Sequence, residues 1–205
     1  MKKRKKKIRG KYLSLDEKTN ALDYLKRAYD FIRQVETDVF AWKWVIISLH
    51  GALYGFAIRA CAGSNPDYVA PVTKKGKNKG ERHLISLNKA LELCQNTRWM
   101  RMFVHSKYLQ LSERQKESIK WLKDKFRNEF EHFSPKGWFI ELHGMPQIII
   151  DVLDVVRFLA LDTGNFFLIP SQQKKVKSII FQSKRILMQS KLYKETEELD
   201  QRSNM

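Results

Sequence analysis

Apolar residues recur every three or four positions along much of the chain. The first such set is Leu22, Leu25, Tyr29, Ile32 and Val35. Side chains at this spacing lie on one face of an α-helix, so the pattern predicts an amphipathic first helix. We expect it to begin at Ser14, because Glu17 three residues later would complete a capping box.

A second predicted helix, about residues 36–62, is apolar on almost every side. Such a helix is stable only when other elements shield its sides from water, so it is expected to be the central and most buried element. His50 and Arg59 within it favour a buried helix over a membrane span. Gly63 and the pair Asn65-Pro66 are expected to end it. A loop of about 18 residues follows, and loops of that length are usually functional or mobile.

The remaining pattern predicts four more helices, over about 82–96, 112–133, 146–162 and 171–191. Ser112 caps the helix 112–133, with Gln115 three residues on. Residues 134–137 break it, and residues 138–142 form a short strand or an extended segment. Thr163-Gly164 is the expected stop of helix 146–162.

The expected fold class is all-α, an up-and-down helical bundle of about five to six helices. A chain of 205 residues is long enough for one substantial core. We expect a basic, disordered tail over residues 1–13, a single helical domain over 14–192, and a polar, frayed C-terminal tail over 193–205.

Positive charge is concentrated in a few places. The formal net charge is +17, and residues 2–11 hold eight Lys or Arg and no acid; removing these eight leaves +9. The long loop adds Lys74, Lys75, Lys77 and Lys79 as candidate substrate-binding residues. This balance favours polyanions as partners, although charge alone gives no sequence specificity. The N-terminal run is either a solubilising tail or an RNA-binding arm.

The two cysteines indicate a reducing compartment. Cys61 and Cys94 lie inside apolar helical patterns, and the chain has no Cys-x-x-Cys. We interpret them as reduced, buried thiols of a cytoplasmic protein. The basic N-terminal run is not followed by an apolar stretch, so it is not a secretory signal.

The helix 112–133 carries an apolar stripe and an unusual outer face. Ile119, Leu122, Phe126, Phe130 and Phe133 fall within about 40° of one direction on an α-helical wheel. Asn128 and His132 lie well away from that stripe, on the same side as Trp121 and Lys125. An outward Trp predicts contact with a second copy of the chain, or with another element such as the last helix.

The end of this helix reads Arg127-Asn128-Glu129-Phe130-Glu131-His132. The strict pattern Arg-Asn-x-x-x-His is expected roughly 0.01 times by chance in a chain of this composition. Late in a helix of a small all-helical bundle, it resembles the motif of the HEPN superfamily. The motif covers six residues, and the bundle architecture extends the likeness to the helices around it. Members of that superfamily are up-and-down bundles that usually dimerise.

The resemblance implies a metal-independent endoribonuclease. Two copies of the motif would meet across a dimer, with Trp121 in the interface and Lys125 beside the substrate. Arg127 would hold the scissile phosphate, and His132 would act as general base or acid. Asn128 would orient either His132 or the phosphate. No metal or other cofactor is implied. The implied partners are RNA, a second copy, and an antitoxin or anti-phage defence protein, with no membrane. A subclass of the superfamily has Tyr two residues after the His; Ser134 stands there in this chain, so its mode of regulation is not carried over.

Other interpretations of the same residues remain open. Arg127 and Glu131 are spaced for a surface salt bridge, and His132 is placed to cap a helix end. Glu129-x-x-His132 also matches a di-iron ligand motif, but no second copy exists. The alternative function is a non-catalytic module that binds RNA or a protein through the basic loop and tail.

Three further polar residues have simpler interpretations. His50 is expected to be a satisfied core histidine. Asp151 and Asp154 form a single acidic pair, which we assign to the polar face of helix 146–162.

Overall fold

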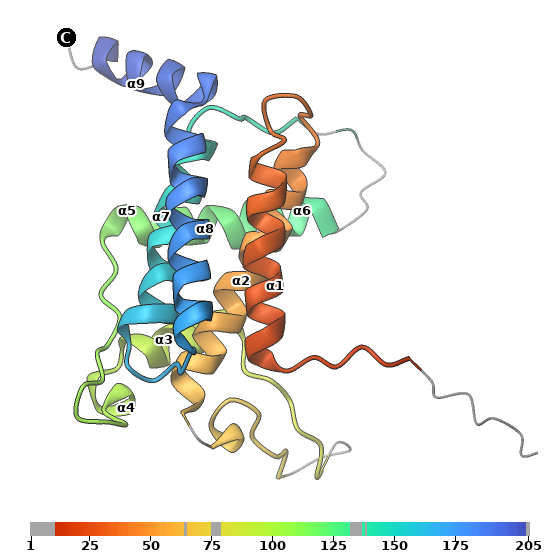
Figure 1. Ribbon diagram of the computed structural model, residues 1–205, viewed down its shortest axis with the longest axis vertical. Helices are drawn as coiled ribbons and strands as arrows, with labels where there is room; N and C mark the ends of the chain where they lie inside the picture. The colour runs from red at the N-terminus through yellow and green to blue at the C-terminus, as the bar shows by residue number, and fades with distance from the viewer. Residues whose placement is uncertain (1–10, 64, 75–78, 132–136, 138, 204–205) are drawn as a thin grey trace, which may run out of the picture.

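The computed structural model describes residues 11–63, 65–74, 79–131, 137 and 139–203. Every regular element in them is helical, apart from an isolated antiparallel bridge between Val72 and Arg82. The predicted all-α class is confirmed. Figure 1 shows α1, α2, α7 and α8 lying lengthwise, with the stretch from α5 to α6 running across them.

Helices α1 (Glu17–Ile32) and α2 (Ala41–Ala62) form an antiparallel pair (Figure 1). The predicted start of α1 at Ser14 is wrong, because the cap is Asp16. Its carboxylate accepts the Thr19 N–H at 2.6 Å, and the Thr19 hydroxyl accepts the Asp16 N–H at 2.9 Å. These two bonds satisfy the backbone N–H groups at the start of the helix, so the cap lies two residues after Ser14 and the helix begins at Glu17.

Helix α2 is the centre of the core, as predicted. Its largest enclosed side chains are Ile46, Leu49, Leu53 and Phe56, all with no exposed surface. It starts at Ala41 rather than near residue 36, because residues 33–37 form turns after α1. Gly63 ends it with φ of 57°, a left-handed value that glycine adopts without strain. The helix is long and apolar enough to cross a bilayer, but two thirds of its most apolar stretch is buried in the protein.

The connection after α2 contains η1 (Pro66–Tyr68) and leads into α3 (Leu87–Gln95) and the short α4 (Thr97–Met100). Helix α3 begins later than residue 82 because Ser86 is its cap and accepts the Lys89 N–H. The basic segment before it is held by the Val72–Arg82 bridge, and Arg82 also forms an ion pair with Asp67.

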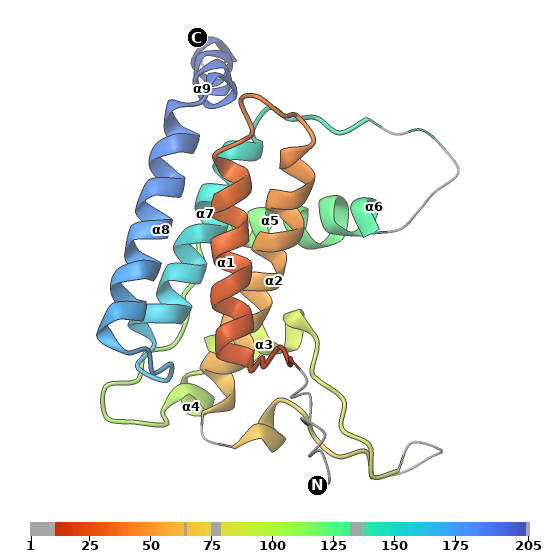
Figure 2. The ribbon, with the colours of Figure 1, turned by 45° about the vertical axis from the view of Figure 1, so that its right-hand side comes forward.

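Helix α5 (Glu113–Lys120), the π-helix η2 (Trp121–Arg127) and α6 (Asn128–Glu131) form one continuous run. The predicted capping box of Ser112 with Gln115 is confirmed at its start. In Figures 1 and 2 this run crosses the lengthwise helices. Its first part packs against α7, and its π-helical part packs against α2.

The C-terminal half consists of α7 (Met145–Arg157), the π-helix η3 (Phe158–Asp162), α8 (Pro170–Gln189) and α9 (Lys191–Ser203). Residues 139–142 form no strand. The expectation of a frayed polar tail after residue 192 is wrong, because α9 is anchored. Leu192 and Tyr193 pack against the core, and the Thr196 hydroxyl accepts the Gly144 N–H at 3.1 Å.

The close approach of α1 to α2 depends on two glycines. A Cβ at Gly55 would lie 2.8 Å from the Ala21 Cβ and 3.3 Å from the Ala21 backbone. At Gly51 the neighbour is the Tyr24 ring. Backbone cannot move aside as a flexible side chain can, so Gly55 sets the distance between the two helices.

We predict that Gly55→Val destabilises the protein by about 1–3 kcal/mol, because overpacking would push α1 from α2. Urea unfolding followed by circular dichroism measures this. Gly137→Val is the matched control, since nothing lies within 4 Å of a Cβ at Gly137. Equal stability of the two variants would contradict the tight helix contact.

Candidate functional site

The predicted motif lies where the π-helix η2 passes into α6. Arg127 is the last residue of η2, and Asn128 is the first of α6. The backbone of Asn128 is described but its side chain is not, and His132 lies outside the described residues. The position of the motif is therefore defined by the Arg127 side chain and by the helical run that carries it.

The π-helix changes the angles expected between Trp121, Lys125 and Arg127. In a π-helix each N–H bonds five residues back instead of four, so each residue turns through a smaller angle than in an α-helix. The α-helical wheel used above therefore does not hold across Trp121–Arg127. Nothing in the residue pattern marks this change, and single π turns often occur at functional sites.

The predicted apolar stripe faces the core despite the π-helix. Ile119, Leu122 and Phe126 are buried as predicted, and Phe130 is partly buried against the core. Phe133 lies outside the described residues. Because π spacing still brings residues four apart near the same side, Leu122 and Phe126 can both face α2.

Arg127 is partly buried rather than fully solvated. Its Nε atom is shielded from solvent. A guanidinium with its stem against protein loses less rotamer freedom when it binds an anion than one in open water does. This placement suits a phosphate-binding arginine, because a planar, fixed donor can contact two phosphate oxygens at once.

Trp121 and Lys125 lie on the outer surface of η2. The Trp121 ring is 40% exposed, and the Lys125 ammonium sits 4.0 Å from its centroid. The two residues line an open hollow of about 490 Å³. Its other lining residues are Glu117, Lys120, Asp124 and Glu129.

The charges in this hollow bear on the role predicted for Lys125. Three carboxylates line it against two ammonium groups. A site with an excess of acids does not attract phosphate by itself. Together with the half-exposed Trp121, the mixed charges fit contact with a protein surface better than contact with RNA.

The basic loop is remote from the motif within one chain. Lys74 and Lys79 are described, whereas Lys75 and Lys77 are outside the described residues. Figures 1 and 2 both show the described parts of this loop at one end of the bundle, away from α6. Lys74 and Lys79 are thus not brought together with Arg127 in one chain.

Sequence reasoning missed Asp151, which it placed on the polar face of its helix. The side chain is only 2% exposed. Its carboxylate accepts the Ser118 hydroxyl at 2.9 Å and the Gln147 amide at 2.8 Å, and pairs with Arg114 at 3.0 Å. It therefore fastens α5 to α7. The one sequence signal was position: Asp151 interrupts an otherwise apolar run, Ile148 to Leu153.

Asp154, by contrast, fits the predicted polar face. It accepts two bonds from Lys184 of α8, both at 2.8 Å, and its side chain is 39% exposed. The two acids that look alike in sequence thus have different environments. Only Asp151 bears on the position of the run that carries Arg127.

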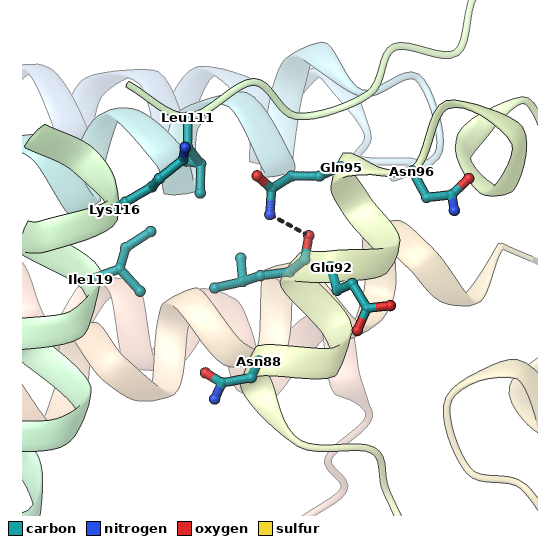
Figure 3. Close-up of a pocket in the computed structure, with 8 residues that line it drawn as sticks. Asn88, Glu92, Gln95, Asn96, Leu111, Lys116 and Ile119 are labelled. Atoms are coloured by element: carbon teal, nitrogen blue, oxygen red, sulfur yellow. Dashed lines mark hydrogen bonds between the residues drawn. The ribbon is translucent and has the colours of Figure 1, made fainter. Parts of the chain in front are cut away.

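A second hollow lies between α3 and α5 and is shown in Figure 3. It measures about 490 Å³. Its polar groups already have partners: the Gln95 amide donates to the Leu91 carbonyl at 3.1 Å, and Lys116 pairs with Glu113 at 2.7 Å. It therefore offers no free set of groups that converge on a ligand.

Metal and thiol chemistry receive little support from the described residues. They contain no group of three or more His, Cys, Asp or Glu placed to hold a metal. Cys61 and Cys94 are buried free thiols, as predicted. A hydrogen bond with Cys61 and burial raise the pKa of the Cys94 thiol well above its usual range. This favours the unreactive, protonated form.

We predict that Asp151→Ala lowers the free energy of unfolding by about 1–3 kcal/mol, because the buried Ser118 hydroxyl loses its partner. Asp154→Ala is the matched control and should cost about 0–1 kcal/mol, as exposed ion pairs do. Urea denaturation of both variants measures the difference. Equal losses would mean that Asp151 does not fasten α5 to α7.

Comparison of the chain with protein-family models, with curated protein sequences and with solved structures finds no match. The resemblance to the HEPN superfamily therefore depends on the six residues from Arg127 to His132 and on the helical architecture.

Proposed function

We propose that this protein is a metal-independent endoribonuclease of HEPN type that acts as a dimer. The observation that carries the proposal is the strict spacing of Arg127, Asn128 and His132 at the end of a helical run. The partial burial of Arg127 supports it, because a fixed guanidinium is what phosphate binding requires. We propose as well that the all-α fold is an up-and-down bundle of HEPN type.

The proposed reaction is an internal transesterification. His132, acting as general base, takes the proton of a ribose 2′-hydroxyl, and the 2′-oxygen attacks the adjacent phosphorus. Arg127 stabilises the negative charge that develops on the phosphoryl oxygens. The 5′-oxygen leaves with a proton supplied by a general acid. The products are a 2′,3′-cyclic phosphate and a 5′-hydroxyl, and no metal enters the balance.

One motif in one chain does not make the site. Arg127 and His132 are five residues apart, and the α-helical wheel separates them by about 140°. At that spacing one helix would not direct both side chains at one phosphate. A second copy would supply the missing group, so the site is composite, with Arg127 of one chain beside His132 of the other.

Positive charge supports RNA as the substrate. The net charge of +17 draws a polyanion towards the protein, most strongly at low ionic strength. Lys74, Lys75, Lys77 and Lys79 would hold RNA beyond the scissile bond. A nuclease of this kind fits a cytoplasmic toxin or anti-phage role, with an antitoxin or defence protein as the partner that controls it.

We expect the wild-type protein to cleave single-stranded RNA in EDTA and to leave 2′,3′-cyclic phosphate ends. His132→Ala and Arg127→Ala should each lower the rate by about 10²–10⁴, the usual worth of a general acid–base or an oxyanion donor. His143→Ala and Arg27→Ala are matched controls, since both residues form exposed ion pairs. Gel electrophoresis with end-group analysis measures all four.

Two outcomes would contradict the proposal. Cleavage that persists in His132→Ala or Arg127→Ala would remove these residues from the chemistry. RNA binding without cleavage, weakened steeply by salt and unchanged in His132→Ala, would favour the non-catalytic module instead.

We expect Trp121→Glu to weaken the dimer by about 2 kcal/mol or more, as the loss of a central interface aromatic does. Trp44→Glu is a close control: Trp44 is also half-exposed, with Lys43 5.1 Å from its ring centroid. Analytical ultracentrifugation measures both dissociation constants. Cleavage by Trp121→Glu should return at high protein concentration. A monomeric wild type, or equal effects of the two variants, would contradict a dimer interface at Trp121.

A further inference from the structure

One end of the bundle carries an apolar surface that no described element covers. It is formed by two loops, residues 101–107 and 163–169, which we call the loop platform. Its exposed apolar side chains are Phe103, Val104, Phe167 and Ile169, with Val104 95% exposed. The Phe103 and Phe167 rings meet edge to face, 5.6 Å apart. Contiguous exposed apolar groups of this kind mark an interaction surface.

The loop platform is fixed, not loose. The Ser106 hydroxyl donates to the Asn165 side-chain oxygen at 2.6 Å, and the Lys107 N–H donates to the Thr163 carbonyl at 2.8 Å. Asn165 is buried and donates in turn to the Met100 carbonyl at 3.2 Å. These bonds join the two loops beneath their apolar tips. The apolar side chains are therefore held outward by structure, at little entropic cost on binding.

The two segments that carry the apolar tips are rich in exposed cations. The segments 97–109 and 163–175 contain no acidic residue. They contain Arg98, Arg101, Lys107, Lys174 and Lys175, all of which are exposed. An apolar centre whose own two loops carry only basic charges is complementary to a surface that is apolar inside and anionic outside.

The N-terminal segment joins the same end. Phe167 lines a hollow together with Ile58 and Arg59 of α2 and the α1 start, which contributes two acids, Asp16 and Glu17, and one cation, Lys18. Tyr12 and Leu13, just before α1, are almost fully exposed. In the sequence they directly follow residues 2–11, which hold eight Lys or Arg and no acid. The chain's densest basic run is thus attached at the end that bears the loop platform.

We propose that this end of the bundle docks on an anionic lipid bilayer. Phe103, Val104, Phe167 and Ile169 enter the boundary between headgroups and acyl chains, and the basic residues contact the headgroups. Stable peripheral binding needs two such signals, one apolar and one electrostatic. RNA fits less well, because the aliphatic Val104 and Ile169 offer no face for base stacking. The sequence argued against a membrane-spanning helix, and docking requires none.

This proposal is independent of the ribonuclease proposal, since the loop platform contains no residue of the motif. The test is sedimentation of the full-length protein with vesicles of phosphatidylcholine and phosphatidylserine in equal parts. Vesicles of phosphatidylcholine alone are the lipid control. Val104→Asp and Phe167→Ser remove apolar contact. Phe181→Ser, at an exposed position midway along α8, is the protein control.

We expect the wild type to bind the mixed vesicles, weakly or not at all the neutral ones, and less well as salt is raised. Val104→Asp and Phe167→Ser should each weaken binding roughly tenfold, in line with the transfer free energy of one apolar side chain. Phe181→Ser should bind like the wild type. All variants replace exposed residues, and thermal unfolding checks that each is folded.

Other results overturn the proposal. Failure of the wild type to bind mixed vesicles does so directly. Binding that is unchanged in Val104→Asp and Phe167→Ser would mean that charge alone, not the loop platform, contacts lipid. Loss of RNA binding rather than vesicle binding in these two variants would assign the loop platform to nucleic acid.

Discussion

The structure depends on enclosing one helix that is apolar on all sides. Helix α2 cannot expose any long face to water, so α1, α3, α7 and the π-helix η2 must cover it between them. Gly51 and Gly55 let α1 approach closely along one side. The transverse run from α5 to α6 covers another side through Leu122 and Phe126. The position of that run, and of the motif at its end, follows from the need to bury α2.

The same packing buries the inner side of η2 and leaves its outer side, which carries Trp121 and Lys125, exposed. Burial fixes the inner side of η2, and the Asp151 network fixes α5 against α7. What remains outward is the half-exposed Trp121 with Lys125 stacked on it. If a second chain covers that surface, the two motifs approach each other. A rigid core would then hold the outer groups in position for chemistry, as catalysis by orientation requires.

Much of the fold could be predicted, because a helix with one buried side has apolar residues at regular intervals in the sequence. The spacing of apolar residues located α1, α2 and the core stripe of α5 to η2, and the pair Ser112 and Gln115 marked a true helix start. Other features leave no such pattern. Asp16, not Ser14, caps α1, because its carboxylate accepts the Thr19 N–H. Both residue types are common helix caps, so residue type alone does not decide between them. Helix α9 depends on tertiary contacts of Leu192 and Tyr193, and the π turns and the burial of Asp151 depend on packing between distant elements. The motif itself was visible in sequence, whereas the π-helix that leads into it and ends at Arg127 was not.

The central claim is that Arg127 of one chain and His132 of another form a single site. Mixing the two inactive variants, Arg127→Ala and His132→Ala, under conditions that exchange subunits tests it most directly. A mixed dimer contains one intact composite site, with Arg127 from one chain and His132 from the other. The account predicts that RNA cleavage, absent from each variant alone, returns on mixing. Mixed dimers that form, as mass measurement would show, yet remain inactive would contradict a site shared between two chains.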